Sequence, residues 1–189
     1  MEHLQELYTV VVAIALSLVV ARLIPAPGGK VTVQPFLLSA ALLVTLIPFY
    51  HGALRHLDEQ YAGAGARQAR GFVLVDFLVL FLESCVFLAL AVSVARPEVF
   101  AWLFFALLAL DVVWVFLTTK FLANGSDLAS QRMWRTINLC AALGLLIPFF
   151  TVSSGNLSYV VLAMAIVRTS VDYALTWRFY APTSTSGLT

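Results

Sequence analysis

Charged side chains are scarce in this sequence. Asp, Glu, Lys and Arg together make up 11% of the 189 residues, whereas 61% of the residues are hydrophobic, and the mean hydropathy is +0.94. Soluble domains are about one quarter charged and about one half apolar. A single soluble core of this length cannot hide so much apolar surface. The composition therefore predicts an integral membrane protein with lipid around most of the chain.

Other residue types are too few, or wrongly placed, for several functional classes. Eleven Lys and Arg are balanced by ten Asp and Glu, so the chain has no basic footprint for nucleic acid. Cys85 and Cys140 both lie in apolar runs, which argues against a disulfide framework. His51 and His56 would not share a helix face, unlike the i, i+4 pairs that bind zinc. We therefore predict no catalytic residue set, no metal site and no cofactor.

Apolar runs of about 20 residues, the length that crosses a bilayer, recur along the chain. We expect an all-α protein with a single transmembrane domain over residues 1–182, no soluble domain, and a disordered tail at 183–189. Residues 136–167 carry no charge and are too many for one crossing, so we place a break at Ser153–Asn156. The six expected spans are residues 7–25, 31–50, 71–95, 99–119, 136–152 and 157–181.

The basic residues between the spans indicate the orientation. An even number of crossings puts both termini on one side, and seven Lys or Arg lie on that side against three on the other. The bias places both termini in the cytoplasm of a plasma membrane or bacterial inner membrane. The seven are Arg55, Arg67, Arg70, Lys120, Arg132, Arg135 and Arg178, and the three are Arg22, Lys30 and Arg96. Aromatic residues near span ends are expected at the membrane interface. They are Tyr50, Trp102, Trp134, Trp177 and Tyr180.

A short sequence echo suggests an internal repeat. Leu46–Tyr50 closes the second expected span, and Leu146–Phe150 closes the fifth in nearly the same letters. These two spans run in opposite directions, so the chain could consist of two inverted three-helix halves, a plan that many transporters use. The alternative is a pair of independent prolines, tolerated because they lie near span ends.

Ionisable side chains inside the expected spans are the strongest functional signal, because each costs about 2.5–3.5 kcal/mol at the bilayer centre. They are Asp76, Glu83, Asp111, Arg168 and Asp172. At about 1.5 Å per residue, Glu83, Asp111 and Arg168 lie near the midplane, and the other two acids lie toward the cytoplasmic side. Four acids share one arginine, so at least two must be protonated, hydrated or paired with an entering ion.

The first functional hypothesis is a channel or transporter for protons or small cations. The carboxylates would carry the proton or cation, and Arg168 would be their internal counter-ion. Nearby hydroxyls are expected to line the same pathway. They are Ser84, Thr118, Thr169 and Ser170. The structural alternative is that Arg168 pairs with Glu83 or Asp111 only to fix the register of the helices.

A second hypothesis is a non-catalytic membrane subunit or effector whose longer cytoplasmic loops recruit a soluble partner. Docking to that partner, or to anionic lipid, would use basic residues at the loop edges. They are Arg55, Arg67, Arg70 and Arg132. A third hypothesis is an intramembrane enzyme that acts on lipid. We also expect a homo-oligomer, since small membrane proteins often build a pathway at a subunit interface.

Overall fold

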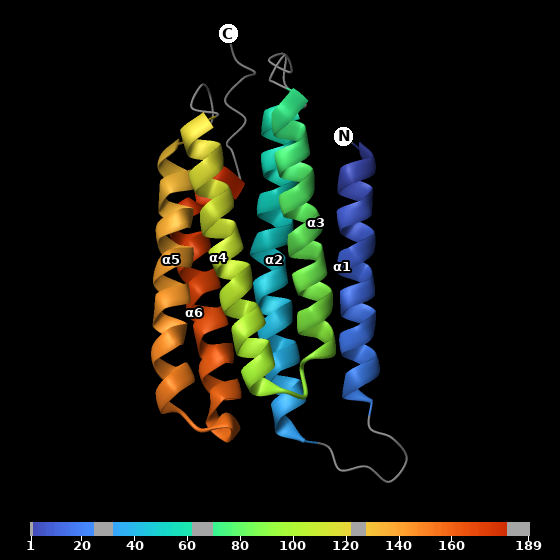
Figure 1. Ribbon diagram of the computed structural model, residues 1–189, viewed down its shortest axis with the longest axis vertical. Coiled ribbons are helices and arrows are strands. Elements are labelled where there is room, and N and C mark those ends of the chain that lie inside the picture. Colours follow the sequence, from blue (N-terminus) through green and yellow to red (C-terminus); the bar gives the residue numbers. More distant parts are fainter. Residues whose placement is uncertain (1, 25–31, 62–69, 122–127, 181–189) are drawn as a thin grey trace.

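The computed structural model describes residues 2–24, 32–61, 70–121 and 128–180, which form six α-helices and no strand. The helices run up and down in one bundle (Figure 1). Each contains a stretch that is long and apolar enough to cross a membrane. Their bounds are α1 Glu2–Leu23, α2 Val33–Tyr61, α3 Arg70–Val92, α4 Pro97–Phe121, α5 Leu128–Thr151 and α6 Ser154–Tyr180.

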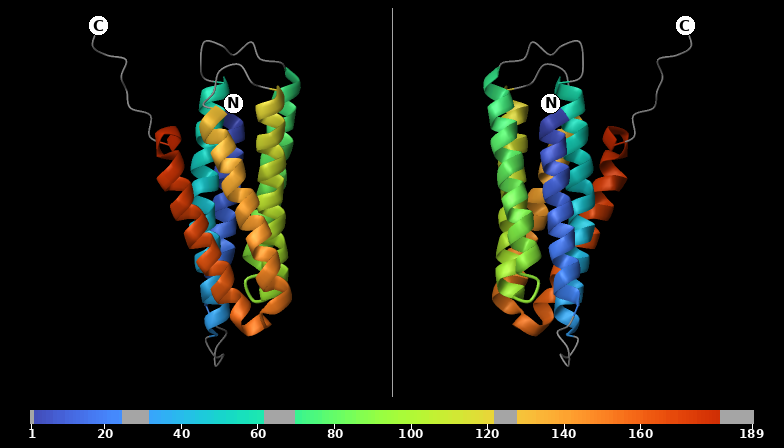
Figure 2. Two further views of the ribbon diagram at one scale, coloured as in Figure 1. Left: turned by 90° about the vertical axis from the view of Figure 1, so that its left-hand side faces the viewer. Right: turned by 90° about the vertical axis from the view of Figure 1, so that its right-hand side faces the viewer.

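Helix α2 lies inside the bundle and packs against α1, α3, α4 and α6. Helix α1 lies at one edge, against α3 and α2, and α5 lies at the opposite edge, against α4 and α6 (Figures 1 and 2). The start of α1 and the end of α6 lie at the same end of the bundle, which we call the terminal end (Figure 1). The α3–α4 and α5–α6 turns lie at the other end, which we call the hairpin end.

The described helices carry apolar side chains on their outer faces as well as in the core. Leu38, Phe87 and Phe104 are fully buried between helices. On the outside, Ile147 and Phe150 expose 70% and 75% of their surfaces. Water would penalise such a surface, whereas lipid does not. The outer face therefore agrees with the membrane class that the composition predicts.

Two tight turns connect consecutive helices close to where the sequence predicts them. Helix α3 ends at Val92, and the N–H of Arg96 donates to the Ser93 carbonyl at 2.8 Å. Helix α4 then begins at Pro97, a first-turn position where a missing N–H costs little. Between α5 and α6, the N–H of Asn156 donates to the Ser153 carbonyl at 2.9 Å. The uncharged stretch 136–167 is thus divided between two helices.

Several helix ends differ from the expected span ends. Helix α2 continues to Tyr61 instead of ending near Tyr50, and α5 begins at Leu128 instead of residue 136. Hydropathy marks only the apolar part of a helix, whereas the backbone hydrogen bonds continue into polar sequence. Pro48 consequently lies inside α2, while Pro148 lies in the last turn of α5. The two echo segments occupy different positions in their helices, and the inverted repeat stays a prediction.

Two of the predicted interfacial aromatics are buried. Trp102 and Trp177 are exposed, but Trp134 and Tyr180 expose only 6% and 5% of their surfaces. Trp134 packs edge-on against Trp114, with ring centres 6.2 Å apart. Trp134 and Tyr180 therefore do not face outward, because position along a helix does not decide which way a side chain points; their place at the membrane interface stays a prediction. The expected tail at 183–189 lies outside the described residues.

Candidate functional site

Four of the five predicted intramembrane charges come together in the core. Glu83 on α3, Asp111 on α4, and Arg168 and Asp172 on α6 expose 2% of their surfaces or less. We call these four residues, together with Asn138 on α5, the central cluster. The helices that supply them are otherwise strongly apolar, so packing of the apolar sides turns these polar groups toward one another.

Asn138 joins three helices within the central cluster. Its Nδ2 donates to Oδ2 of Asp111, and its Oδ1 accepts from Nε of Arg168 at 2.7 Å. An amide suits this position because it offers a donor and an acceptor at once. Sequence reasoning missed Asn138, although it is the one amide side chain in the expected span 136–152.

Arg168 is the positive charge of the central cluster. Its Nη2 lies 3.4 Å from Oδ2 of Asp172, one helical turn later, and both side chains are fully buried. The guanidinium carbon lies 4.8 Å from the ring centre of Phe49 on α2, which is cation–π geometry. A guanidinium carries a positive charge and offers five N–H donors. Its single positive charge can balance the negative charge of one carboxylate. The carboxylate with which it forms an ion pair is that of Asp172.

A kink in α6 completes the surroundings of Asp172. Thr176 has non-helical backbone angles (φ −117°, ψ 18°), and its hydroxyl lies 2.8 Å from Oδ1 of Asp172. The Tyr180 hydroxyl donates to Oδ2 of the same carboxylate at 3.1 Å. In a straight helix Asp172 and Tyr180 would be about 12 Å apart along the axis. The kink at Thr176 helps the Tyr180 ring to fold back toward Asp172. Burial and the nearby Asp172 carboxylate raise the pKa of Tyr180, which keeps its hydroxyl a proton donor.

The central cluster holds three carboxyl groups and one guanidinium, and not all of their polar atoms find partners. Oε1 of Glu83 and Oδ1 of Asp111 are buried without a hydrogen-bond partner, and so are Nη1 and Nη2 of Arg168. The Tyr8 hydroxyl on α1 interacts with Glu83 but makes no hydrogen bond of normal geometry. If all three acids were ionised, one guanidinium would leave two negative charges uncompensated. Each unpaired buried charge would cost several kcal/mol.

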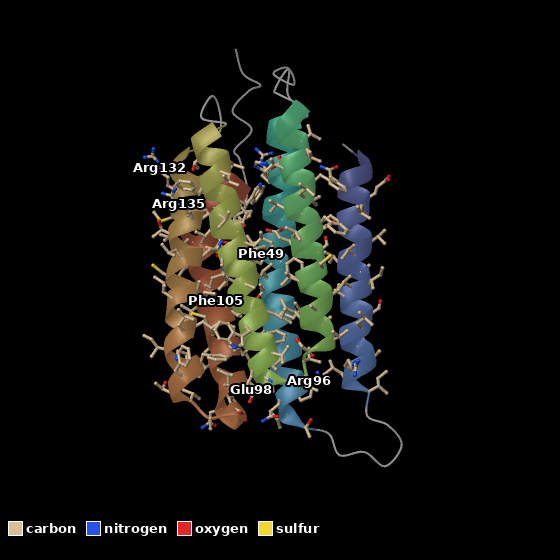
Figure 3. All side chains as sticks on the ribbon, in the orientation of Figure 1. Phe49, Arg96, Glu98, Phe105, Arg132 and Arg135 are labelled. Atoms are coloured by element: carbon tan, nitrogen blue, oxygen red, sulfur yellow. The ribbon has the colours of Figure 1, made fainter. Side chains whose placement is uncertain are left out.

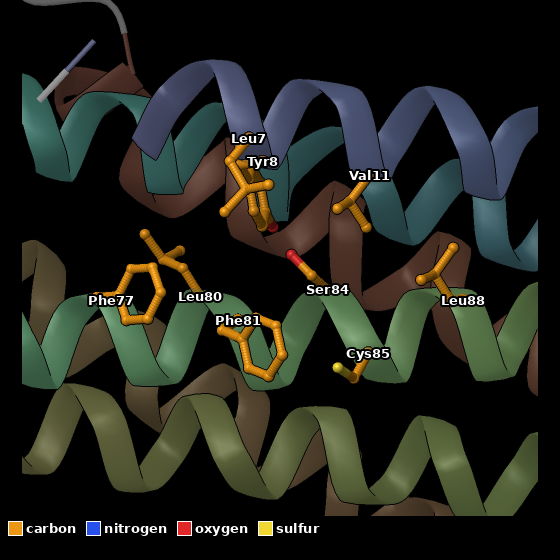
Figure 4. Close-up of a pocket in the computed structure, with 9 residues that line it drawn as sticks. All are labelled: Leu7, Tyr8, Val11, Phe77, Leu80, Phe81, Ser84, Cys85 and Leu88. Atoms are coloured by element: carbon orange, nitrogen blue, oxygen red, sulfur yellow. The ribbon is translucent and has the colours of Figure 1, made fainter. Parts of the chain in front are cut away.

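A small cavity lies between α1 and α3. Its volume is about 80 Å³, and apolar side chains line most of it together with Tyr8 and Ser84 (Figure 4). A water molecule needs only about 10–15 Å³ of such volume, but also two or more polar partners. The predicted pathway residue Ser84 points its hydroxyl from α3 toward α1 here (Figure 4).

Asp76 does not join the central cluster. It is fully buried, its Oδ1 accepts from Nε1 of Trp114 on α4 at 2.9 Å, and its Oδ2 lies 3.2 Å from Nε2 of His56 on α2. Asp76 lies two helical turns, or about 10 Å, from Glu83 along α3. Both of its oxygens have partners, as those of Asp172 do, whereas Glu83 and Asp111 each keep one buried oxygen without a hydrogen-bond partner. Sequence reasoning considered His56 only as a metal ligand and did not foresee this pair.

The other predicted pathway hydroxyls are dispersed. Thr169 donates to the Val44 carbonyl on α2 at 3.2 Å and thereby links α6 to α2. Thr118 donates to Val115 in its own helix at 3.0 Å, and Ser170 is exposed. The hydroxyls thus hold helices or face outward and form no continuous row with the acids.

Two of the four predicted docking arginines, Arg55 and Arg132, have side chains that the structure describes. Arg132 is exposed on α5 near the terminal end (Figure 3), and Arg55 on α2 is half-buried. Arg70 begins α3, and Arg67 lies outside the described residues. The two described side chains lie on different helices, α2 and α5.

The chemistry that the central cluster supports is protonation and hydrogen bonding. Among the described residues, no three His, Cys, Asp or Glu side chains are arranged to hold a metal ion. Comparison of the chain with protein-family models, with curated proteins and with solved structures finds no match.

Proposed function

We propose that the chain is a membrane proton transporter whose central cluster binds the transported proton. The observation that carries the proposal is the pair of buried carboxylate oxygens without a partner, one on Glu83 and one on Asp111. A purely structural network would satisfy its buried groups. Arg168, Asp172 and Asn138 already hold α5 and α6 together through their own contacts, whereas the unpartnered oxygens of Glu83 and Asp111 are free to take up a proton.

A proton fits this site better than a metal cation. A bound cation needs several oxygen ligands around one space, and the carboxylates of the described residues offer no such grouping. A proton needs one carboxylate oxygen and no cavity. The Glu83 and Asp111 carboxyls meet this requirement, and the adjacent Tyr8 hydroxyl can exchange a hydrogen bond with a protonated Glu83.

The distribution of polar groups favours a transporter over an open pore. Toward the hairpin end the core consists of large apolar side chains such as Leu38, Leu90 and Phe104. The buried hydroxyls of Ser39 and Ser158 are isolated within this region. A proton at the central cluster would need a change in helix packing to leave on the hairpin side. Helix α1, held by α3 and α2 alone among the described helices, is the element best placed to move.

The basic residues support an orientation with the terminal end in the cytoplasm. Arg132 and Arg135 lie at the terminal end, whereas Arg96 and Glu98 lie together at the hairpin end (Figure 3). This placement follows the excess of basic residues on the cytoplasmic side of membrane proteins. The central cluster would then receive protons from the cytoplasmic side and release them on the other.

The test is proton flux in liposomes that contain the purified protein and a trapped pH-sensitive dye. Under a potassium diffusion potential, wild-type liposomes should change internal pH faster than empty ones. Glu83→Gln keeps the size of the side chain and removes its titration, so this variant should lose the flux. Glu98→Gln makes the same chemical change at an exposed position and should keep it. Wild-type liposomes no faster than empty ones, or full flux in Glu83→Gln, would overturn the proposal.

A further inference from the structure

An exposed histidine lies beside the edge of the central cluster. His51 on α2 is about 27 Å along the helix from Val33, close to the full thickness of a hydrocarbon core of about 30 Å. Its side chain is exposed on the bundle surface. The Nδ1 atom lies 3.3 Å from the Tyr173 hydroxyl, and the His51 ring packs on the Tyr180 ring with centres 4.8 Å apart. The imidazole is thus held on the face of α6 that carries Tyr173 and Tyr180.

Tyr180 joins this histidine to the central cluster. The side-chain contacts of the Asp172 carboxylate come from Arg168, Thr176 and Tyr180, and all three are buried. Of these, Tyr180 is the one whose ring also packs against an exposed ionisable side chain. The contacts therefore lead from the surface at His51 to the Tyr180 ring, and from the Tyr180 hydroxyl to Oδ2 of Asp172.

We infer that His51 is the group through which protons pass between water at the terminal end and the central cluster. The Tyr173 hydroxyl fixes the ring through Nδ1, which leaves Nε2 to exchange protons. Nε2 takes a proton from water and gives it to the Tyr180 oxygen, while Tyr180 gives its own proton to Oδ2 of Asp172. Imidazole and phenol then return to their starting forms, and the carboxylate has become a carboxylic acid. Imidazole is the side chain suited to such a relay near neutral pH.

The inference rests on the proposed proton transport, and the same liposome assay can test it separately. His51→Gln should lower the flux by about tenfold or more, a lower bound because a proton-transfer group typically contributes about 10²–10⁴-fold. Added imidazole should restore the flux, because a small soluble buffer can deliver protons to Tyr180 in place of the missing ring. Tyr180→Phe should lower the flux to a similar extent, but imidazole should not restore it. Tyr159→Phe removes an exposed hydroxyl near the hairpin end of α6 and serves as the matched control.

The outcomes separate the two proposals. No wild-type flux overturns proton transport itself. Wild-type flux that is unchanged in His51→Gln overturns only the role of His51. A slow His51→Gln variant that imidazole does not restore, although its unfolding midpoint is unchanged, assigns His51 a structural role and also overturns the inference. If His51→Gln fails to fold, unchanged flux in Tyr180→Phe would overturn the role of His51 instead.

Discussion

Replacement of Arg168 by methionine would test how the central cluster is stabilised. Methionine keeps an unbranched apolar stem and removes the positive charge. The change deletes the 2.7 Å hydrogen bond to Asn138, the 3.4 Å ion pair with Asp172 and the contact over the Phe49 ring. It leaves the Asp172 carboxylate buried without its counter-charge.

The expected loss is large because the carboxylate cannot reach water. Removal of one partner from a buried ion pair costs about 3–5 kcal/mol, and the unbonded Asn138 oxygen adds to this loss. We therefore expect Arg168→Met to lower the free energy of unfolding by about 3 kcal/mol or more. Asp172→Asn in the same chain should recover part of that loss, since a neutral amide no longer requires the cation. The coupling energy should lie within the usual range of about 0.5–3 kcal/mol for neighbouring residues.

The assay is equilibrium unfolding in mixed micelles, followed by tryptophan fluorescence, since Trp114 and Trp134 are buried. Arg132→Met makes the same change at an exposed site and should stay within about 0.5 kcal/mol of wild type. A loss below about 1 kcal/mol for Arg168→Met, or strictly additive losses in the double variant, would refute the claim that Arg168 compensates a buried carboxylate.

Two further predictions concern packing and alkaline stability. A Cβ atom at Gly52 would lie 2.6 Å from the buried Trp134 ring, so Gly52→Ala should lower the free energy of unfolding by about 1–3 kcal/mol. The control is Gly155→Ala, because the nearest atom to a Cβ there would be 4.0 Å away. Equal stability of the two variants would contradict the packing of Gly52 against Trp134. The raised pKa of Tyr180 means that its stabilising contribution is complete below about pH 10, the usual tyrosine value, and is lost as pH rises above it. Wild type should therefore lose stability above that pH more steeply than Tyr180→Phe does, and parallel pH curves would contradict the buried hydroxyl.

Hydropathy and charge placement were enough to predict the helices and four members of the central cluster. Asp111, for example, interrupts an apolar run, and such a residue must face the bundle interior because lipid cannot solvate it. Asn138 carries no charge and was overlooked, although its amide holds Asp111 and Arg168 together. Tyr180 was predicted at the interface from its depth, but the kink at Thr176 and the packing of α6 turned it inward.

The sequence by itself determined that the chain forms long apolar helices and that a few buried charges must find partners, because lipid offers neither water nor hydrogen bonds. The tertiary structure decided which partners they find. Glu83 and Asp76 share one face of α3, two turns apart. Asp76 nevertheless pairs with His56 and Trp114, whereas one carboxylate oxygen of Glu83 has no hydrogen-bond partner. That difference depends on which neighbouring helix lies opposite each turn, and spacing within a single helix carries no information about it.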